Sequence, residues 1–171
     1  MSETPDETAP LIVEAMRKAA VAWLGELPDQ PPGRTCTVWC AWLDDALYVV
    51  SGPGEQAVPG LAGATRCTVT ARGDSGGRIV TWPADVTRVV PGGDEWERVV
   101  PQLAGKRLNL PADDDTAARW AADCTVSRLA PAGSPRTPLP ADSLAAPAPG
   151  SPAARRTATP FRLHRLPKRR R

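Results

Sequence analysis

Histidine is nearly missing from this chain: His164, close to the carboxyl end, is the single one among 171 residues. No histidine precedes it, so the body of the chain cannot form a Ser-His-Asp triad, a histidine proton shuttle or a histidine-containing zinc site. Phenylalanine and tyrosine occur once each, which leaves six tryptophans to supply nearly all the large aromatic rings. Any chemistry in the body must therefore use other side chains or a cofactor.

Several sequence signals are missing as well. No GxGxxG follows an expected strand and no GxxxxGK[ST] occurs, so neither a dinucleotide fold nor a P-loop is indicated. The amino terminus, MSETPDETAP, is acidic and polar, whereas a secretory signal is basic and then apolar. No run approaches the roughly 20 apolar residues of a membrane span. These absences predict a soluble, cytoplasmic protein.

The four cysteines, Cys36, Cys40, Cys67 and Cys124, show no CxxC spacing. Three of them lie in apolar strand patterns, which is typical of buried, reduced thiols. Cys36 and Cys40 share a strand face, but a zinc site needs further thiolates at metal spacing. The acidic run at residues 113–115 lacks the alternate spacing of a calcium loop and better suits a helix start. We therefore expect no metal site.

Charge divides the chain into an acidic body and a basic tail. Residues 131–171 hold nine Lys or Arg and one acid, which leaves residues 1–130 with a net charge of −6. The tail is rich in Pro, Ala and Ser without periodicity, so we expect it to be disordered, as we do residues 1–8. Its basic clusters either contact nucleic acid or an anionic membrane nonspecifically or have no specific role. The expected folded domain is residues 9–130.

Side-chain alternation predicts most of the folded elements. Residues 35–43 alternate with a period of two, and residues 47–50 follow after Asp44-Asp45, so these two strands should form an antiparallel hairpin. Residues 21–24 fit either the end of the first helix or a first strand, and we favour a strand. The remaining expected elements are a helix from Thr8 to about Ala19, strands at 65–71, 78–90 and 124–129, a helix that Asp94 caps and Pro101 bends or restarts, and a short helix at 117–122. Six strands with helical inserts predict a mainly β chain that forms a small antiparallel barrel.

The loop after the hairpin, Ser51 to Gln56, is the best candidate for a working rim. Glycines on both sides of Pro53 either let a ligand approach the backbone closely or simply form a tight exit from the strand. Most of the tryptophans should pack the core, and one or two of them could stack on a planar ring. Arg34, Lys106 and Arg107 are the basic residues best placed by sequence to meet an anion, although such residues commonly stay solvated.

Three segments carry a resemblance to a known family: LYVVSGPGEQ at 47–56, GGRIVTWPADVTRV at 76–89 and EWERVVPQLAGKRLN at 95–109. They resemble the pyridoxamine 5′-phosphate oxidase-like family of flavin-binding split barrels, in particular its small actinobacterial members. The resemblance implies a six-stranded antiparallel split β-barrel that forms a homodimer and holds flavin mononucleotide (FMN) in a cleft between the subunits. It also implies an FMN-dependent oxidoreductase acting on an unidentified small molecule. The alternative is a non-catalytic relative that binds another ligand or a protein partner, with the basic tail as an electrostatic tether.

The resemblance also implies where the cofactor binds. Arg34 and Ser51 match the family's phosphate-binding positions, but its Arg-Lys pair falls here on Gln56 and Ala57, beside Glu55. A carboxylate there repels a phosphate unless another cation compensates. Either Lys106 and Arg107 take over the role of the pair, or this chain binds flavin weakly, or it has exchanged the ligand. The expected cofactor-binding residues are Arg34, Trp39, Ser51, Gly52, Gln56, Trp82, Lys106 and Arg107.

Overall fold

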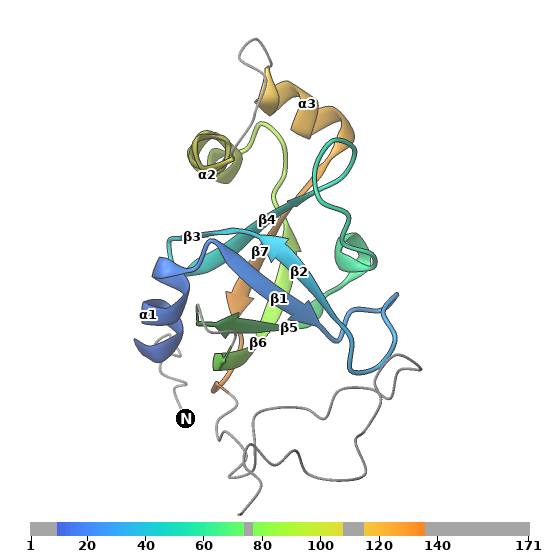
Figure 1. The fold of residues 1–171 in the computed structure, drawn as a ribbon. Helices are drawn as coiled ribbons and strands as arrows, with labels where there is room; N and C mark the ends of the chain where they lie inside the picture. The colour runs from blue at the N-terminus through green and yellow to red at the C-terminus, as the bar shows by residue number, and fades with distance from the viewer. Residues whose placement is uncertain (1–9, 74–76, 108–114, 136–171) are drawn as a thin grey trace, which may run out of the picture. The chain divides into compact units, whose positions relative to one another are not determined.

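The computed structural model describes residues 10–73, 77–107 and 115–135, which form one antiparallel sheet with three α-helices (Figure 1). The elements are α1 (Pro10–Lys18), β1 (Val21–Gly25), β2 (Thr35–Trp39), β3 (Ala41–Leu43), β4 (Ala46–Ser51), the short 3₁₀ turn η1 (Leu61–Gly63), β5 (Arg66–Arg72), β6 (Arg78–Arg88), α2 (Asp94–Lys106), α3 (Thr116–Asp123) and β7 (Thr125–Pro131). The seven strands follow the order β2-β1-β5-β6-β7-β4-β3. The expectations for residues 1–8 and for most of the tail lie outside the described residues.

The expected strand at residues 35–43 is two strands, which corrects the count from six to seven. Cys40 separates them, and its backbone N–H donates to the carbonyl of Ala20 at 3.0 Å. Before this point β2 pairs with β1, and after it β3 pairs with β4. Since β2 and β3 are the two outer strands of the sheet, the chain passes directly from one edge to the other at Cys40. This link closes the sheet into the split barrel.

The side-chain alternation along residues 35–43 was predicted correctly in spite of the break. Val38 and Cys40 belong to one buried cluster, together with Leu24 and Trp82. Trp39 and Ala41 face a second cluster, which also contains Tyr48, Val50, Trp96, Leu103, Trp120 and Val126. The two faces of β2 and β3 therefore contribute to two separate parts of the core.

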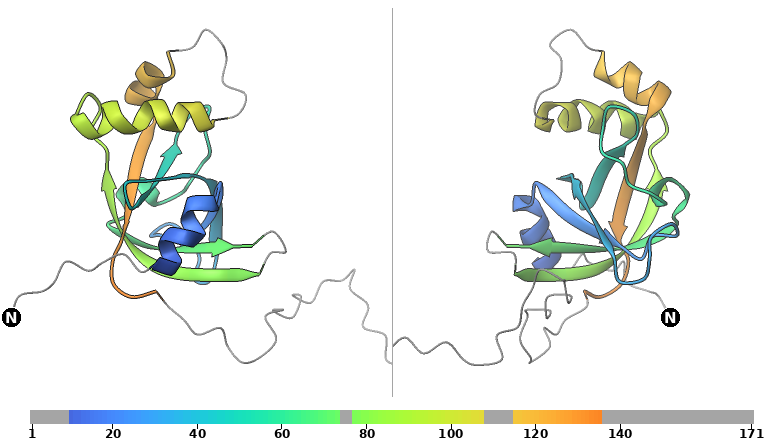
Figure 2. Two further views of the ribbon diagram at one scale, coloured as in Figure 1. Left: turned by 90° about the vertical axis from the view of Figure 1, so that its left-hand side faces the viewer. Right: turned by 45° about the vertical axis from the view of Figure 1, so that its right-hand side comes forward.

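The helices cover different parts of the sheet. Helix α1 packs against β3 and β6 and buries Ile12 and Met16 in the first cluster (Figure 2). The chain then enters β1 at Val21, so residues 21–24 are a strand, as predicted. Helices α2 and α3 contact each other at one end of the sheet and close the second cluster (Figure 1).

Helix α2 differs from the prediction in two details. Gly93 is its N-cap and makes no side-chain capping bond, whereas Asp94 had been expected there. Pro101 lies inside one continuous helix, so no restart occurs at this residue. Pro101 and Glu97 are both exposed, and water can therefore solvate the Glu97 carbonyl, which a proline four residues later leaves without a helical donor. Helix α2 thus reaches Lys106 unbroken.

The described residues also bear on the metal and membrane expectations. All four cysteines are free, with Cys40, Cys67 and Cys124 buried. Burial raises the pKa of both the Cys40 and the Cys67 thiol to about 12. Asp115 caps α3 by accepting from the N–H of Ala118 at 3.1 Å, and no group of metal-binding side chains occurs among the residues that the structure describes. Within the same ranges, no helix is long and apolar enough to cross a membrane.

Candidate functional site

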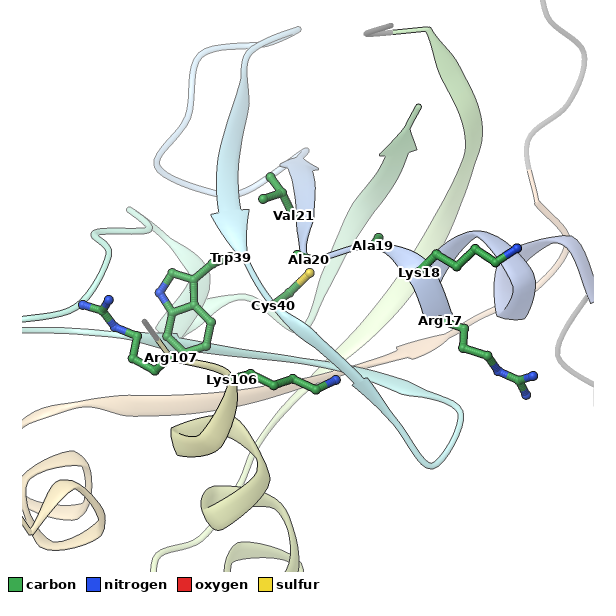
Figure 3. Close-up of a pocket in the computed structure, with 9 residues that line it drawn as sticks. All are labelled: Arg17, Lys18, Ala19, Ala20, Val21, Trp39, Cys40, Lys106 and Arg107. Atoms are coloured by element: carbon green, nitrogen blue, oxygen red, sulfur yellow. The ribbon is translucent and has the colours of Figure 1, made fainter. Parts of the chain in front are cut away.

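A pocket of about 470 Å³ lies where the carboxyl ends of α1 and α2 meet the junction of β2 and β3 (Figure 3). This volume falls within the range of roughly 300 to 1,000 Å³ that is usual for small-molecule sites. The lining residues are Arg17, Lys18, Ala19, Ala20, Val21, Trp39, Cys40, Lys106 and Arg107. The pocket therefore combines an apolar floor, one indole ring and four basic side chains.

The four basic residues make the pocket strongly positive. Arg17 and Lys18 form the last turn of α1, and Lys106 ends α2, where cations also interact favourably with the helix dipole. Lys18 pairs with Glu14 on the exposed side of α1. Among the described residues, no carboxylate lies within salt-bridge distance of Arg17 or Lys106, and none lines the pocket. Arg17 and Lys106 are thus the cations best able to hold an anion there.

Trp39 supplies the aromatic surface of the pocket. It ends β2 opposite Val21 of β1, and Figure 3 shows its ring beside Lys106 and Arg107. The guanidinium carbon of Arg107 lies 5.8 Å from the Trp39 ring centroid. The Trp120 ring packs on Trp39 at 6.4 Å between centroids, with the planes tilted by 37°. Trp39 is therefore held between an arginine and a second indole while remaining at the pocket wall.

Behind this wall lies Glu55, whose side chain has no exposed surface. One carboxylate oxygen, Oε2, accepts from Nε of Arg107 at 2.8 Å. The other, Oε1, accepts from Nη2 of Arg119 and from Nε1 of Trp120, both at 3.0 Å. Burial acts to raise the pKa of Glu55, but hydrogen bonds from Arg107, Trp120 and Arg119 outweigh it and hold the pKa below its usual value. Glu55 is consequently ionised and its charge is compensated.

The sequence singled out Arg107 as a replacement for the missing phosphate-binding pair, whereas the structure shows it bound to Glu55, and it did not single out Arg119. Arg119 lies 64 residues from Glu55 along the chain and reaches it because α3 leads into β7, whose first residue, Thr125, pairs with Ser51 at the end of β4. No spacing in the sequence signals that contact. Arg17 and Lys18 were missed as pocket residues for the same reason, since their approach to Lys106 depends on how α1 docks.

Gln56, an expected cofactor contact, uses its side chain to fasten the loop to β2. Its Oε1 accepts from the N–H of Trp39 at 2.8 Å. Its Nε2 donates to the carbonyls of Trp39 at 2.9 Å and Val50 at 3.0 Å. These three bonds to main-chain groups make Gln56 a structural support for Trp39.

Ser51 and Gly52 lie at the end of β4 and do not line the pocket. Ser51 is buried opposite Thr125 of β7. Gly52 has φ 144°, and a Cβ at this position would come within 2.9 Å of the carbonyl oxygen of Asp123. Close packing against the chain itself accounts for this glycine, which favours the tight exit over the close approach of a ligand.

Arg34 and Trp82 lie apart from the pocket as well. Arg34 is exposed in the loop before β2, about 16 Å along an extended chain from Trp39. Trp82 is fully buried and meets Trp42 edge-on at 6.0 Å between centroids, and its Nε1 has no partner among the described residues. Of the eight expected binding residues, the pocket thus brings together Trp39, Lys106 and Arg107. The binding roles of all eight remain predictions.

Comparison with solved structures supports the split-barrel fold. The heme storage protein HutZ of Vibrio cholerae superposes with a TM-score of 0.54 at 13% identity, covering 76% of this chain and 94% of that one. A putative pyridoxamine 5′-phosphate oxidase from Listeria innocua gives a TM-score of 0.50 at 15% identity, covering 73% and 93%. No protein-family model and no curated protein sequence matches the chain. At these identities the likeness establishes the fold, and it confirms the predicted split barrel.

Proposed function

We propose that the pocket binds an anionic ligand with a planar ring, and that FMN is the ligand it fits first. The observation that carries this proposal is the position of the Trp39 ring beside Lys106 and Arg107 in a pocket without a lining carboxylate. An indole face suits a flat heteroaromatic ring, and paired cations suit a phosphate. Lys106 and Arg17 hold the phosphate in this proposal, because Nε of Arg107 already binds Glu55.

The residues present fit such a cofactor in volume and in charge. A pocket of about 470 Å³ provides room for a cofactor-sized ligand. When bound, FMN would supply the redox chemistry, and the protein would position the cofactor. The side chains of this chain would bind the phosphate, stack on the ring and exclude water from its face. We further propose a cytoplasmic homodimer that acts as an oxidoreductase on a small molecule.

The first test compares FMN with riboflavin, which has the same ring but no phosphate. Protein purified without added cofactor is titrated into each flavin, and quenching of flavin fluorescence is followed. FMN should bind about tenfold more tightly or better, because charge-assisted hydrogen bonds to its phosphate add to ring stacking. If neither flavin is quenched and the protein is colourless, the flavin proposal is wrong.

Substitution of Trp39 tests the ring contact separately. In the variant Trp39→Ala both flavins should bind more weakly by a similar factor, since the ring is common to both. Trp23→Ala is the matched control, because Trp23 is also a partly buried tryptophan of the sheet but does not line this pocket. Equal losses in the two variants would place the ring elsewhere.

A second function is favoured by one observation. Glu55 already binds Arg107 and Arg119, so these two cations are less available to a phosphate dianion. In this second reading the split barrel binds a less charged ligand or a protein partner without catalysis. Riboflavin binding as tightly as FMN would favour it.

A further inference from the structure

Three hydrogen-bond donors converge on Glu55 from two helical regions, both of which are distant from Glu55 in the sequence. Arg107 directly follows α2, while Arg119 and Trp120 belong to α3. The two guanidinium groups and the indole N–H lie 2.8 to 3.0 Å from the carboxylate oxygens, and the Glu55 side chain is fully buried. Two arginines and a neutral donor around one buried anion have the composition of a carboxylate- or phosphate-binding site.

The loop that carries Glu55 is built to hold the carboxylate in this cluster. Gly52 and Gly54 have φ angles of 144° and 77°, which most other residues disfavour. The N–H of Glu55 donates to the Gly52 carbonyl at 3.0 Å, and the N–H of Gly52 donates to the Gln56 carbonyl at 3.2 Å. A Cβ on Gly54 would come within 3.1 Å of Nη1 of Arg119. The backbone at Gly54 thus passes close to Arg119, which binds Glu55.

We propose that Arg107, Arg119 and Trp120 form an anion-binding site whose resident ligand is Glu55, and that this occupancy lowers the preference of the adjoining pocket for phosphorylated ligands. The first part stands on the geometry of the cluster alone. The second part rests on the proposed function, because it concerns the ligand of the pocket. Arg107 connects the two, since it lines the pocket on one side and binds Glu55 on the other.

The same carboxylate also fixes both neighbours of the ring surface. Arg107 lies over Trp39, Trp120 packs beside it, and Glu55 accepts a hydrogen bond from each. Removal of Glu55 would therefore take one negative charge away from beside the pocket and loosen the support of Trp39. The first effect acts on the phosphate, whereas the second acts on the ring, so the two can be measured separately.

Acetate rescue tests the anion site without any flavin. The variant Glu55→Ala should melt at a lower temperature than the wild type, and added sodium acetate should restore part of the loss in a saturable manner. Asp85→Ala is the matched control, because Asp85 also accepts from an arginine, Arg66 at 2.9 Å, but at an exposed position. Sodium chloride at equal ionic strength controls for salt. Equal responses of the two variants to acetate would overturn the proposal of an anion site.

If Glu55→Ala does not fold, Glu55→Ser replaces it, with Asp85→Ser as the control. The shorter serine side chain removes the charge and leaves the carboxylate position open to a small anion. Acetate should then raise the melting temperature of Glu55→Ser more than that of Asp85→Ser. An increase no larger than that of the control would again overturn the anion site.

The flavin titration tests the effect on the pocket. In Glu55→Gln the ratio of riboflavin to FMN dissociation constants should rise about tenfold over the wild-type ratio, since a negative charge beside the phosphate is removed. An unchanged ratio, with both flavins still bound, would show that Glu55 does not set selectivity. If the wild type binds neither flavin, the proposed function and the effect on selectivity fail together, while acetate rescue still decides the anion site.

Discussion

At the scale of single residues, Gln56 and Glu55 explain why the loop after β4 has its sequence. Gln56 binds the backbone of Trp39 and Val50, and Glu55 binds Arg107, Arg119 and Trp120. Neither residue lines the pocket. Both act on the pocket through Trp39. Gln56 binds the Trp39 backbone, and Glu55 binds Arg107 and Trp120, which flank the Trp39 ring.

Replacement of Gln56 by alanine should destabilise the fold. The change leaves the Trp39 N–H and two carbonyls without their side-chain partner in a partly buried place, at a cost of about 2 to 3 kcal/mol. The exposed Gln102, which donates only to the Arg98 carbonyl, is the control, and Gln102→Ala should cost less than about 0.5 kcal/mol. Urea unfolding measures both. If Gln56→Ala lowered the free energy of unfolding no more than Gln102→Ala, the three hydrogen bonds of Gln56 would not stabilise the fold.

Glu55 should also make stability depend on pH in the acidic range. Its pKa is lower in the folded chain than the ordinary 4.5, so the unfolded chain binds more protons between the two values. The stability that Glu55 contributes is complete above about pH 4.5 and is lost as the pH falls through the folded pKa. Urea unfolding of the wild type and of Glu55→Gln should give a difference in free energy that narrows below that pH. A difference that widens there would contradict the assignment.

At the scale of elements, the crossing at Cys40 decides the architecture. It joins the two edge strands β2 and β3, and it also places Trp39 next to the ends of α1 and α2. The side-chain alternation along residues 35–43 predicted which side chains share a face of the sheet. It did not predict the break between β2 and β3, because the break depends on a hydrogen bond from Cys40 to Ala20, and the local pattern carries no information about that partner.

The loop exit after β4 gives a prediction at this scale. Gly52→Ala should cost about 2 kcal/mol or more, because the backbone is strained for any L side chain and the new Cβ would lie 2.9 Å from the Asp123 carbonyl oxygen. Gly105→Ala in α2 is the control, since nothing lies within 4 Å of its Cβ position, and alanine should stabilise that helix by about 0.5 to 1 kcal/mol. Thermal unfolding would contradict the account if the two changes had the same sign.

The candidate site was predictable only in part, because some of its contacts depend on how helices pack against the rest of the chain. Trp39 could be singled out as one of the tryptophans able to stack on a planar ring, and Lys106 and Arg107 as basic residues near the end of an expected helix. Arg17 and Arg119 could not, because their approach to the pocket and to Glu55 depends on how α1 and α3 dock. Trp82 shows the opposite case, where a tryptophan in a family-like segment serves the core.

At the scale of the whole molecule, the charge of the pocket is opposite in sign to the net charge of residues 1–130. Residues 1–130 carry a net charge of −6, yet the pocket is lined by four basic side chains and no acidic one. A basic pocket in an acidic body attracts anions locally. Ligand binding should therefore weaken as ionic strength rises, and this dependence should be larger for FMN than for riboflavin.

The carboxyl-terminal tail should be dispensable for the barrel. The last backbone hydrogen bond shown near this end joins Ala132 to Pro83, so deletion of residues 135–171 removes none of the sheet. The sequence of the deleted segment has little apolar surface to bury, so folding and the proposed dimerisation should be retained. Circular dichroism melting and sedimentation measure both properties. A large drop in melting temperature would show that the tail supports the fold.

The most direct test of the central claim, that this pocket binds an anionic ligand with a planar ring, is the affinity of the double variant Arg17→Ala, Lys106→Ala for FMN. FMN should bind this variant at least about tenfold more weakly than the wild type, with riboflavin affected much less. Arg88→Ala, an exposed arginine outside the pocket, should leave FMN affinity unchanged. An FMN affinity that is the same in the double variant, in Arg88→Ala and in the wild type would contradict the account.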